Sequence, residues 1–285
     1  MSTQEKKIVL RDVAEKMGLP KEYARRPKKA AQYGSKFDKG IGKLAKKRGL
    51  SKSEYLGQFY KEKNLKLGSL ISSGKDSLYA AYIMEQRNYE VTCFLTMESS
   101  NTESYMFHTP NINLAAKQAE VCGKPIIIQK TVGEKEKELD DLKILLQKAK
   151  DEFGVEGIVS GALFSTYQRD RIENICDELG LVSFTPLWHK DQTSYMKELV
   201  TNNFEFILSA IAAEGLTKKW LGKTISLEDV DALAKISGIQ PAGEGGEFES
   251  FVTNCPLFSR PLSIKKATIH MESECAGIYA IEDIE

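Results

Sequence analysis

The chain has 285 residues, with 40 Lys and Arg, 40 Asp and Glu, and five cysteines. It contains no run of about 18 apolar residues, and its first residues lack the apolar core of a signal peptide. The sequence therefore predicts a cytoplasmic protein with no membrane partner. The cysteines form no C-x-x-C pair, which gives a zinc or iron–sulfur site no support. Their odd number and the predicted cytoplasmic location favour reduced thiols.

Residues 1–64 differ in charge from the rest of the chain. They carry 18 Lys and Arg against seven Asp and Glu, whereas the remainder carries 22 against 33. Short helices are predicted here, over 8–17, 21–32, 37–47 and 51–63. Ser51 is a candidate N-cap, with Glu54 three residues later completing a capping box. No strand or catalytic pattern is found, so we expect a basic helical extension.

From residue 65 the pattern changes to alternating strands and helices. Strands are predicted over 66–71, 91–97, 125–130, 157–160 and 182–185. Helices are predicted between them, over 75–87, 111–122, 134–152 and 165–179. This alternation predicts an α/β fold over 65–188, in which helices cover a Rossmann-like parallel sheet.

After residue 188 the pattern is less regular. The sequence predicts helices near 191–202 and 226–238, a strand over 204–212, a Gly/Glu-rich loop over 242–250 and a last strand near 263–271. We interpret 189–285 as a smaller α/β subdomain that contributes to substrate binding.

Residues 72–77, Ser-Ser-Gly-Lys-Asp-Ser, join the first strand of the α/β region to its first helix. Ligands of doubly wound sheets bind at such a turn, and the N–H groups at a helix start attract anions. Gly74 allows the backbone to approach a phosphate, and Lys75 adds a positive charge. Hydroxyl donors come from Ser72, Ser73 and Ser77. The loop is therefore predicted to bind nucleotide phosphates.

The loop is not a Walker A motif, because Asp76 stands where that motif has its magnesium-binding Ser or Thr. It resembles instead the PP-loop, S-G-G-x-D-S, of the N-type ATP pyrophosphatases. Ser73 departs from that motif, which usually has Gly there. The resemblance implies an adenine nucleotide α-hydrolase-like fold that binds ATP, with Asp76 near Mg2+ and with Met97 and Gly161 in the nucleotide site.

Three further stretches narrow the choice of substrate. Residues 106–126 contain a His before a predicted helix, 159–188 contain G-A-x-x-S-x-Y-Q-R-x-R, and 242–258 contain G-E-x-G-E-F. Together with the loop at 72–77 they resemble the diphthine–ammonia ligase family, over about residues 65–275. The candidate substrate-binding residues are His108, Ser165, Gln168, Arg169, Arg171, Glu244, Glu247 and Phe248.

The resemblance implies an ATP-dependent amide ligase. A carboxylate of diphthine, a modified histidine on elongation factor 2, attacks the α-phosphate of ATP, and ammonia then converts the acyl-adenylate to an amide. Lys75 would stabilise the leaving pyrophosphate and Asp76 would hold magnesium. Glu247 is taken as a third catalytic residue. The partners implied are elongation factor 2 and ammonium, and a homodimer is one assembly state considered.

Several residues have a simpler alternative interpretation. Arg169 and Glu173 are four apart on a helix and could form only a solvated ion pair, and His108 could belong to a helix-start turn. We hypothesise that Glu244, Glu247 and Phe248 hold a cation, either ammonium or the quaternary ammonium of diphthine, with Phe248 making a cation–π contact. The alternative functions are a tRNA-modifying PP-loop ATP pyrophosphatase and a non-catalytic ATP-binding regulator.

Residues 6–35 resemble the C-terminal end of archaeal-type asparagine synthetases, through L-R-x-x-A-x-x-x-G-L-P and R-P-K-K-A-A-Q-Y-G-S. Ser2 stands where a glutaminase domain of that family has its cysteine nucleophile, so free ammonia is the expected nitrogen source. The segment could be a fused remnant, a basic arm that binds the translation factor or RNA, or a cover for the ATP site. We favour an accessory segment without a catalytic role. Its few aromatic residues give no support for sequence-specific RNA recognition.

Overall fold

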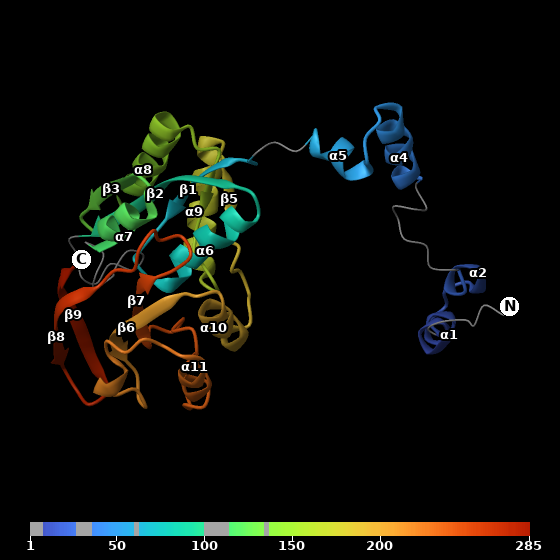
Figure 1. The fold of residues 1–285 in the computed structure, drawn as a ribbon. Helices are drawn as coiled ribbons and strands as arrows, with labels where there is room; N and C mark the ends of the chain where they lie inside the picture. Colours follow the sequence, from blue (N-terminus) through green and yellow to red (C-terminus); the bar gives the residue numbers. More distant parts are fainter. Residues whose placement is uncertain (1–7, 27–35, 60–62, 100–113, 134–136) are drawn as a thin grey trace. The chain divides into compact units, whose positions relative to one another are not determined.

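The computed structural model describes residues 8–26, 36–59, 63–99, 114–133 and 137–285. The chain separates into two compact units, Met1–Lys61 and Glu62–Glu285 (Figure 1), which are described one at a time. None of the helices in these ranges has the length and apolarity needed to span a bilayer.

The first unit is built from short helices. They are α1 (Ile8–Lys16), α2 (Lys21–Ala24), α4 (Phe37–Lys47) and α5 (Lys52–Gly57). The predicted capping box is confirmed, because the Ser51 hydroxyl accepts from the Glu54 N–H and the Glu54 carboxylate accepts from the Ser51 N–H. Arg25 forms ion pairs with Asp12 and Glu15, which hold α2 against α1.

Two helices of this unit are shorter than predicted. The helix expected over 21–32 ends at Ala24, and residues 27–32 lie outside the described ranges. The helix expected over 51–63 ends at Gly57. Tyr55 is the one buried side chain of α5, so little tertiary packing opposes the low helix propensity of glycine at its end.

The second unit begins with a five-stranded parallel sheet. Its strands are β1 (Lys66–Leu70), β2 (Glu90–Ser99), β3 (Ile126–Thr131), β4 (Gly157–Val159) and β5 (Val182–Phe184), in the order β3-β2-β1-β4-β5. All four neighbouring pairs are parallel. This topology confirms the predicted Rossmann-like fold, with strand bounds within two residues of those expected.

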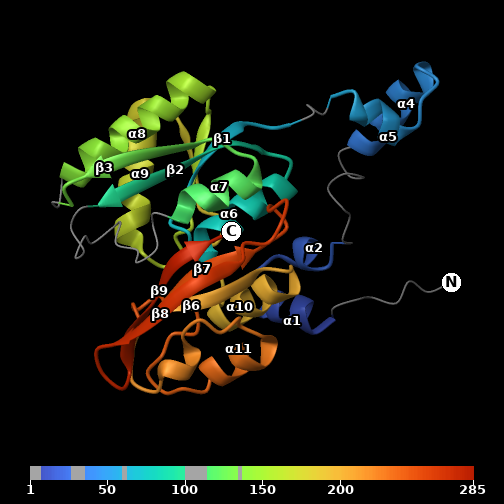
Figure 2. The same ribbon diagram turned by 60° about the vertical axis from the view of Figure 1, so that its left-hand side comes forward.

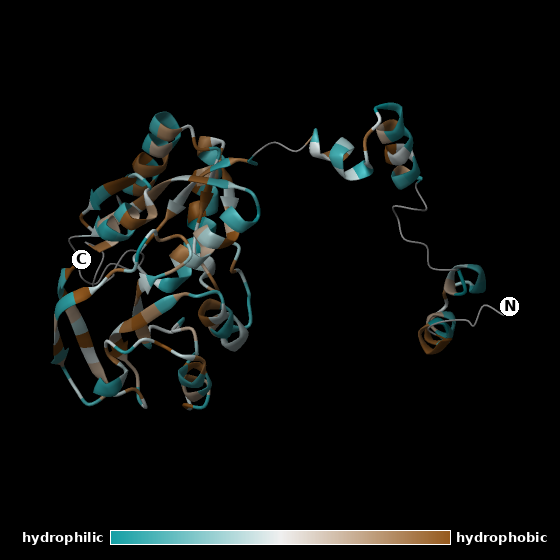
Figure 3. Ribbon diagram, viewed as in Figure 1, coloured by the Kyte–Doolittle hydropathy of each residue, from teal (hydrophilic) through white to brown (hydrophobic). Residues whose placement is uncertain are grey.

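Helices cover both faces of this sheet (Figures 1 and 2). They are α6 (Lys75–Gln86), α7 (Ala115–Cys122), α8 (Lys137–Phe153) and α9 (Thr166–Leu179). Leu95 and Ile158 pack with α8 and α9 on one face, while Phe94 and Val159 pack with α6 and α7 on the other. Figure 3 shows α8 with both hydrophobic and hydrophilic residues, as expected for a helix that covers a sheet. The starts predicted for α7 and α8 fall partly outside the described ranges.

The C-terminal part adds an antiparallel sheet of order β7-β6-β9-β8. Its elements are α10 (Gln192–Thr201), β6 (Glu205–Ala212), the 3-10 turn η2 (Lys218–Trp220), α11 (Leu227–Leu233), β7 (Phe248–Asn254), β8 (Ile264–Met271) and β9 (Ala276–Ile284). Strands β7 and β9 were not predicted, and the loop expected to reach residue 250 ends where β7 begins. The helix expected to reach 238 ends at Leu233, shortly before the positive-φ Gly238.

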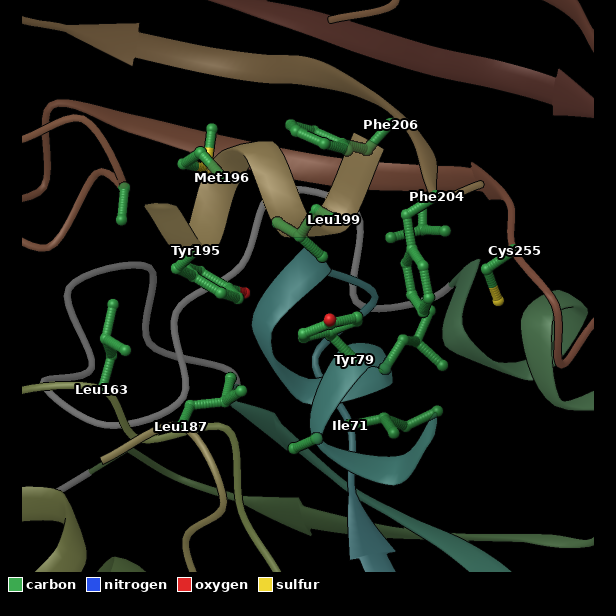
Figure 4. Close-up of a cluster of buried hydrophobic side chains, with 14 of the residues drawn as sticks. Ile71, Tyr79, Leu163, Leu187, Tyr195, Met196, Leu199, Phe204, Phe206 and Cys255 are labelled. Carbon is green, nitrogen blue, oxygen red and sulfur yellow. The ribbon is translucent and has the colours of Figure 1, made fainter. Parts of the chain in front are cut away.

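One hydrophobic cluster joins the two sheets of this unit (Figure 4). The Tyr79 ring of α6 packs edge-on against Phe204, with ring centroids 5.0 Å apart, and also lies 5.8 Å from the Tyr195 ring of α10. Tyr79 and Tyr195 are almost completely buried. This packing fixes α10 beside the first helix of the parallel sheet, and so beside the loop that precedes it.

Candidate active site

A cavity of about 540 Å³ lies beyond the carboxyl ends of β1, β2 and β4. The order of the parallel strands reverses beside β1, and doubly wound sheets bind ligands at that point. The volume of the cavity is in the range of small-molecule pockets. The predicted site residues that line it are Ser72, Gly74, Lys75, Asp76, Ser77, Met97, Gly161, Ser165, Gln168, Glu244 and Phe248.

The loop at 72–77 connects β1 to the N-terminus of α6. Gly74 is the N-cap residue, in an extended conformation. The Ser77 hydroxyl accepts from the Ser72 N–H at 3.2 Å and donates to the Gly74 carbonyl at 3.1 Å. The Ser77 side chain therefore maintains the shape of the loop, and the helix N-terminus points its N–H groups toward the cavity region.

Ser73 adopts a left-handed conformation, with φ of 67°. Its carbonyl accepts from Gln118 Nε2 at 3.0 Å and from the Val252 N–H at 3.2 Å, while its side chain is buried outside the cavity lining. Glycine adopts this conformation without the steric cost that a side chain brings. The preference of the PP-loop motif for Gly at this position thus has a backbone reason.

Gly161 sits where the end of β4 meets the start of α6. A Cβ atom built on this residue would lie 2.7 Å from the backbone carbonyl carbon of Asp76 and 2.7 Å from the Ser77 nitrogen. Both of those atoms belong to backbone, which cannot move aside cheaply. A residue without a side chain is therefore required for this close approach.

Lys75 is 3% exposed and is held by the C-terminal part of the unit. Its Nζ donates to the Ala242 carbonyl at 2.7 Å and to Asp76 Oδ2 at 2.9 Å, and its backbone N–H donates to Ser250 Oγ at 3.1 Å. The Phe248 ring centroid is 5.4 Å from this Nζ. The cation that Phe248 contacts in the structure is thus Lys75, whereas the sequence hypothesis assigned it a substrate cation.

Asp76 is partly exposed, and its second oxygen, Oδ1, accepts from the Tyr195 hydroxyl at 2.7 Å. Tyr195 is fully buried. Burial first, and then the charge of Asp76, raise the pKa of this phenol well above its ordinary value. Tyr195 therefore remains a neutral hydrogen-bond donor to the carboxylate.

Two glutamates of the C-terminal part add negative charge to the cavity. Burial, together with the charge of Asp76, raises the pKa of Glu244 to about 7. Burial also raises the pKa of Glu249 to about 7, against the opposing influence of the Lys75 charge. Glu244 accepts a hydrogen bond from the Phe164 N–H at 3.3 Å. A cation in this cavity would stabilise the ionised form of both carboxylates.

Glu247 has a different position from its two acidic neighbours. It is 8% exposed and does not line the cavity. Its Oε1 accepts from the Gln240 N–H at 2.9 Å and its Oε2 accepts from the Gly245 N–H at 2.8 Å. These bonds favour a role in holding its own loop over the catalytic role predicted for it.

The candidate residues of α9 divide into two groups. Ser165 is the N-cap residue, accepting from the Gln168 N–H at 3.3 Å, and both side chains line the cavity. Arg169 bonds to Asp170 at 2.6 Å, lies 3.7 Å from Glu173 and covers the Trp188 ring at 4.2 Å.

Arg171 lies 3.4 Å from the Tyr167 ring centroid. Neither it nor Arg169 lines the cavity, so the simpler ion-pair interpretation fits Arg169. His108 lies outside the described ranges.

Sequence reasoning missed Tyr195, Glu249 and Ser250 as site residues. Glu249 belongs to the Gly/Glu-rich stretch, so its composition was a signal, but its place on strand β7 beside the buried Phe248 and Ser250 is known only from the structure. Tyr195 gives no local signal, because its contact with Asp76 spans 119 residues.

The fold and the cavity define an α/β protein whose Rossmann-like sheet presents the loop at 72–77 to a pocket that the C-terminal part helps to line. The family description "Diphthamide synthase N-terminal domain" matches residues 65–183, and "Diphthamide synthase C-terminal domain" matches residues 191–285. The chain belongs to the diphthamide synthase, or diphthine–ammonia ligase, family. This is a family of ATP-dependent ligases, so ATP is its nucleotide. Residues 1–64 lie outside both matches.

Curated relatives agree with this assignment. The chain is 31% identical to diphthine–ammonia ligase of Rattus norvegicus over 237 residues, which cover 75% of this chain and 89% of that protein. It is 30% identical to the Homo sapiens enzyme over 233 residues, covering 73% and 86%. It is 30% identical to the Saccharomyces cerevisiae enzyme over 229 residues, covering 68% of this chain and 33% of the yeast protein.

Two solved structures have distant likeness. A predicted subunit of tRNA methyltransferase from Methanocaldococcus jannaschii matches with a TM-score of 0.36 and 16% identity, covering 68% of this chain and 98% of that one. The U34-tRNA thiolase NcsA from Methanococcus maripaludis, with its [4Fe-4S] cluster, matches with a TM-score of 0.32 and 14% identity, covering 49% and 58%.

Proposed function

We propose that this protein is an ATP-dependent amide ligase that converts diphthine on elongation factor 2 to diphthamide with ammonium. The reaction would proceed through an acyl-adenylate and release pyrophosphate and AMP. The observation that carries the proposal is the meeting of Lys75 and Asp76 with the carboxylates of Glu244 and Glu249 in one cavity. Membership of the diphthine–ammonia ligase family supports it.

The nucleotide would lie with its phosphates against the loop at 72–77. The N-terminus of α6 and the buried Lys75 ammonium favour negative charge there, and both are in place before the reaction. Leu95, Met97 and Ile172 give the cavity an apolar wall that suits a purine base. In this arrangement Lys75 stabilises the charge that develops on the departing pyrophosphate.

Asp76 is the residue we propose as the magnesium ligand. Among the described residues, no three His, Cys, Asp or Glu side chains form a metal site by themselves. That fits magnesium, which is commonly held by one or two carboxylates together with substrate phosphates and water. When bound, magnesium supplies charge neutralisation on the phosphate oxygens.

The sequence predicts that Glu244, Glu247 and Phe248 hold a substrate cation. In the proposed site Glu244 keeps this role, and Glu249 replaces Glu247 and Phe248. We propose that Glu244 and Glu249 hold the ammonium nucleophile, since both carboxylates line the cavity whereas that of Glu247 is engaged by its own loop. With its pKa raised to about 7, Glu249 can accept a proton from ammonium near neutral pH, which leaves ammonia as the attacking species.

The organisation around this site remains a set of predictions. We propose that residues 65–188 form the nucleotide-binding part, that 189–285 form the substrate part, and that the basic residues 1–64 are an accessory segment. We do not expect nucleic-acid binding by 1–64, and RNA titration of the full chain tests that expectation. A homodimer is an open assembly state, which light scattering tests.

Pyrophosphate release tests the proposed function. The full chain is incubated with ATP, Mg2+ and ammonium, with and without elongation factor 2 that carries diphthine. We expect release only with the modified factor, and its loss in Lys75→Met. Glu274→Gln, which changes an exposed glutamate between β8 and β9, serves as the control. Release that requires tRNA, or ATP binding without release in every mixture, would contradict the proposal and favour one of the alternative functions.

A further inference from the structure

Tyr195 connects the C-terminal part of the unit to the nucleotide loop. It lies on α10, is fully buried, and donates its hydroxyl hydrogen to Asp76 Oδ1 at 2.7 Å. Its ring packs in the same cluster as Tyr79 (Figure 4), so the hydroxyl has a fixed position. A residue distant in sequence thus determines where one oxygen of the Asp76 carboxylate points.

The second oxygen of Asp76 is also held. Oδ2 accepts from Lys75 Nζ at 2.9 Å, and that Nζ is itself bound to the Ala242 carbonyl at 2.7 Å. The carboxylate is therefore fixed at both ends. Because each carboxylate oxygen has two lone pairs, each retains acceptor capacity for a further ligand. Removing the Tyr195 hydroxyl would leave the carboxylate held only through Oδ2, by Lys75.

Gln192 is a second residue of α10 that holds the site, and it binds the loop at 240–247. Its Oε1 accepts from the Ala242 N–H at 3.0 Å, and its Nε2 donates to Gln240 Oε1 at 2.8 Å. Gln192 and Tyr195 are three apart on the helix and so lie on one face. The same helix face therefore holds the loop at 240–247 and the Asp76 carboxylate.

We propose that Tyr195 is a positioning residue whose hydroxyl fixes the Asp76 carboxylate in the orientation that binds the metal–ATP complex. It acts through Asp76 and touches neither ATP nor the acceptor carboxylate. The inference rests on the proposed function only in taking Asp76 as the magnesium ligand. Partners that orient a metal ligand commonly change metal affinity or activity 10–100-fold when removed.

The test compares Tyr195→Phe with Tyr79→Phe. Tyr79 is the matched control, because its hydroxyl is also in this cluster but accepts from Asn202 Nδ2 at 3.1 Å and does not bond to Asp76. ATP binding to the full chain is measured by calorimetry across a Mg2+ titration and without metal. We expect Tyr195→Phe to raise the half-saturating Mg2+ concentration about 10–100-fold and to leave metal-free ATP binding unchanged, while Tyr79→Phe changes neither.

An unchanged Mg2+ requirement in Tyr195→Phe would overturn the inference, as would an equal shift in both variants. Asp76→Glu gives a second test that leaves the buried ring in place. It keeps the charge but displaces the carboxylate by one methylene from the position that the Tyr195 hydroxyl holds, and it should raise the Mg2+ requirement as well. A wild-type protein that binds Mg–ATP but never amidates elongation factor 2 would contradict the proposed function and leave this inference testable.

Discussion

Glu249→Gln removes one of the half-buried negative charges of the cavity with little other change. None of the described residues donates a hydrogen bond to this carboxylate, and the amide has nearly the same shape. The folded protein raises the pKa of Glu249 from 4.5 to about 7, chiefly by burial. At 1.36 kcal/mol for each pKa unit, the ionised form costs at most about 3 kcal/mol, and we expect about 1–3 kcal/mol.

The sign follows from proton binding. Below pH 4.5 both the folded and the unfolded chain hold the Glu249 proton, so the group costs nothing. Between pH 4.5 and about 7 the unfolded chain loses the proton first, so the stability of the folded protein falls as the pH rises. Above pH 7 the cost is complete. Glu249→Gln should therefore be more stable than wild type at pH 8 and equal to it at pH 4.

Urea unfolding of the ligand-free full chain at pH 4, 6 and 8 measures this difference, with Glu274→Gln as the exposed control. A stability gain that does not change with pH would show that the charge of Glu249 is not its cause. A destabilised Glu249→Gln at pH 8 would refute the reasoning, because it would mean that the carboxylate has a stabilising partner in the folded protein.

Three further variants test other features of the site. Ser73→Gly should raise the free energy of unfolding by about 0.5–1 kcal/mol, because the relief of left-handed strain exceeds the cost of glycine's greater freedom in the unfolded chain. Ser73→Ala keeps the strain and should give no such gain. Gly161→Ala should lower stability by about 1–3 kcal/mol and weaken ATP binding, since its Cβ meets the α6 backbone. Glu247→Gln should lower the melting temperature, because one buried backbone N–H loses its acceptor, which destabilises the fold by about 1–3 kcal/mol. Full loss of activity without destabilisation would instead favour a catalytic role for Glu247.

The parallel sheet and its helices could be predicted because their signals are local. The apolar run before Ser72 and the amphipathic pattern of α8 each identify an element without knowledge of its neighbours. Strand β7 was missed because Glu249 interrupts its hydrophobic residues with a half-buried charge. That charge is part of the candidate site, so the hydrophobic pattern expected of a strand is broken there for a functional reason.

The contents of the candidate site were only partly accessible from the sequence. The loop at 72–77 and Glu244 stand out by composition and motif. Glu249 lines the cavity whereas Glu247 holds its own loop, and this difference depends on the turn at Gly245, whose N–H binds the Glu247 carboxylate. The contact of Tyr195 with Asp76 depends on the packing of two sheets, which no short window of sequence contains.

The most direct test of the account is the mass of elongation factor 2 after reaction with this protein. Diphthine-bearing factor is incubated with the full chain, ATP, Mg2+ and 15N-labelled ammonium, and the modified histidine peptide is analysed by mass spectrometry. We expect the small mass change of an acid that becomes an amide, with the 15N label in the product and only when ATP is present. An unlabelled, unchanged peptide, from a protein that binds ATP under the same conditions, would contradict it.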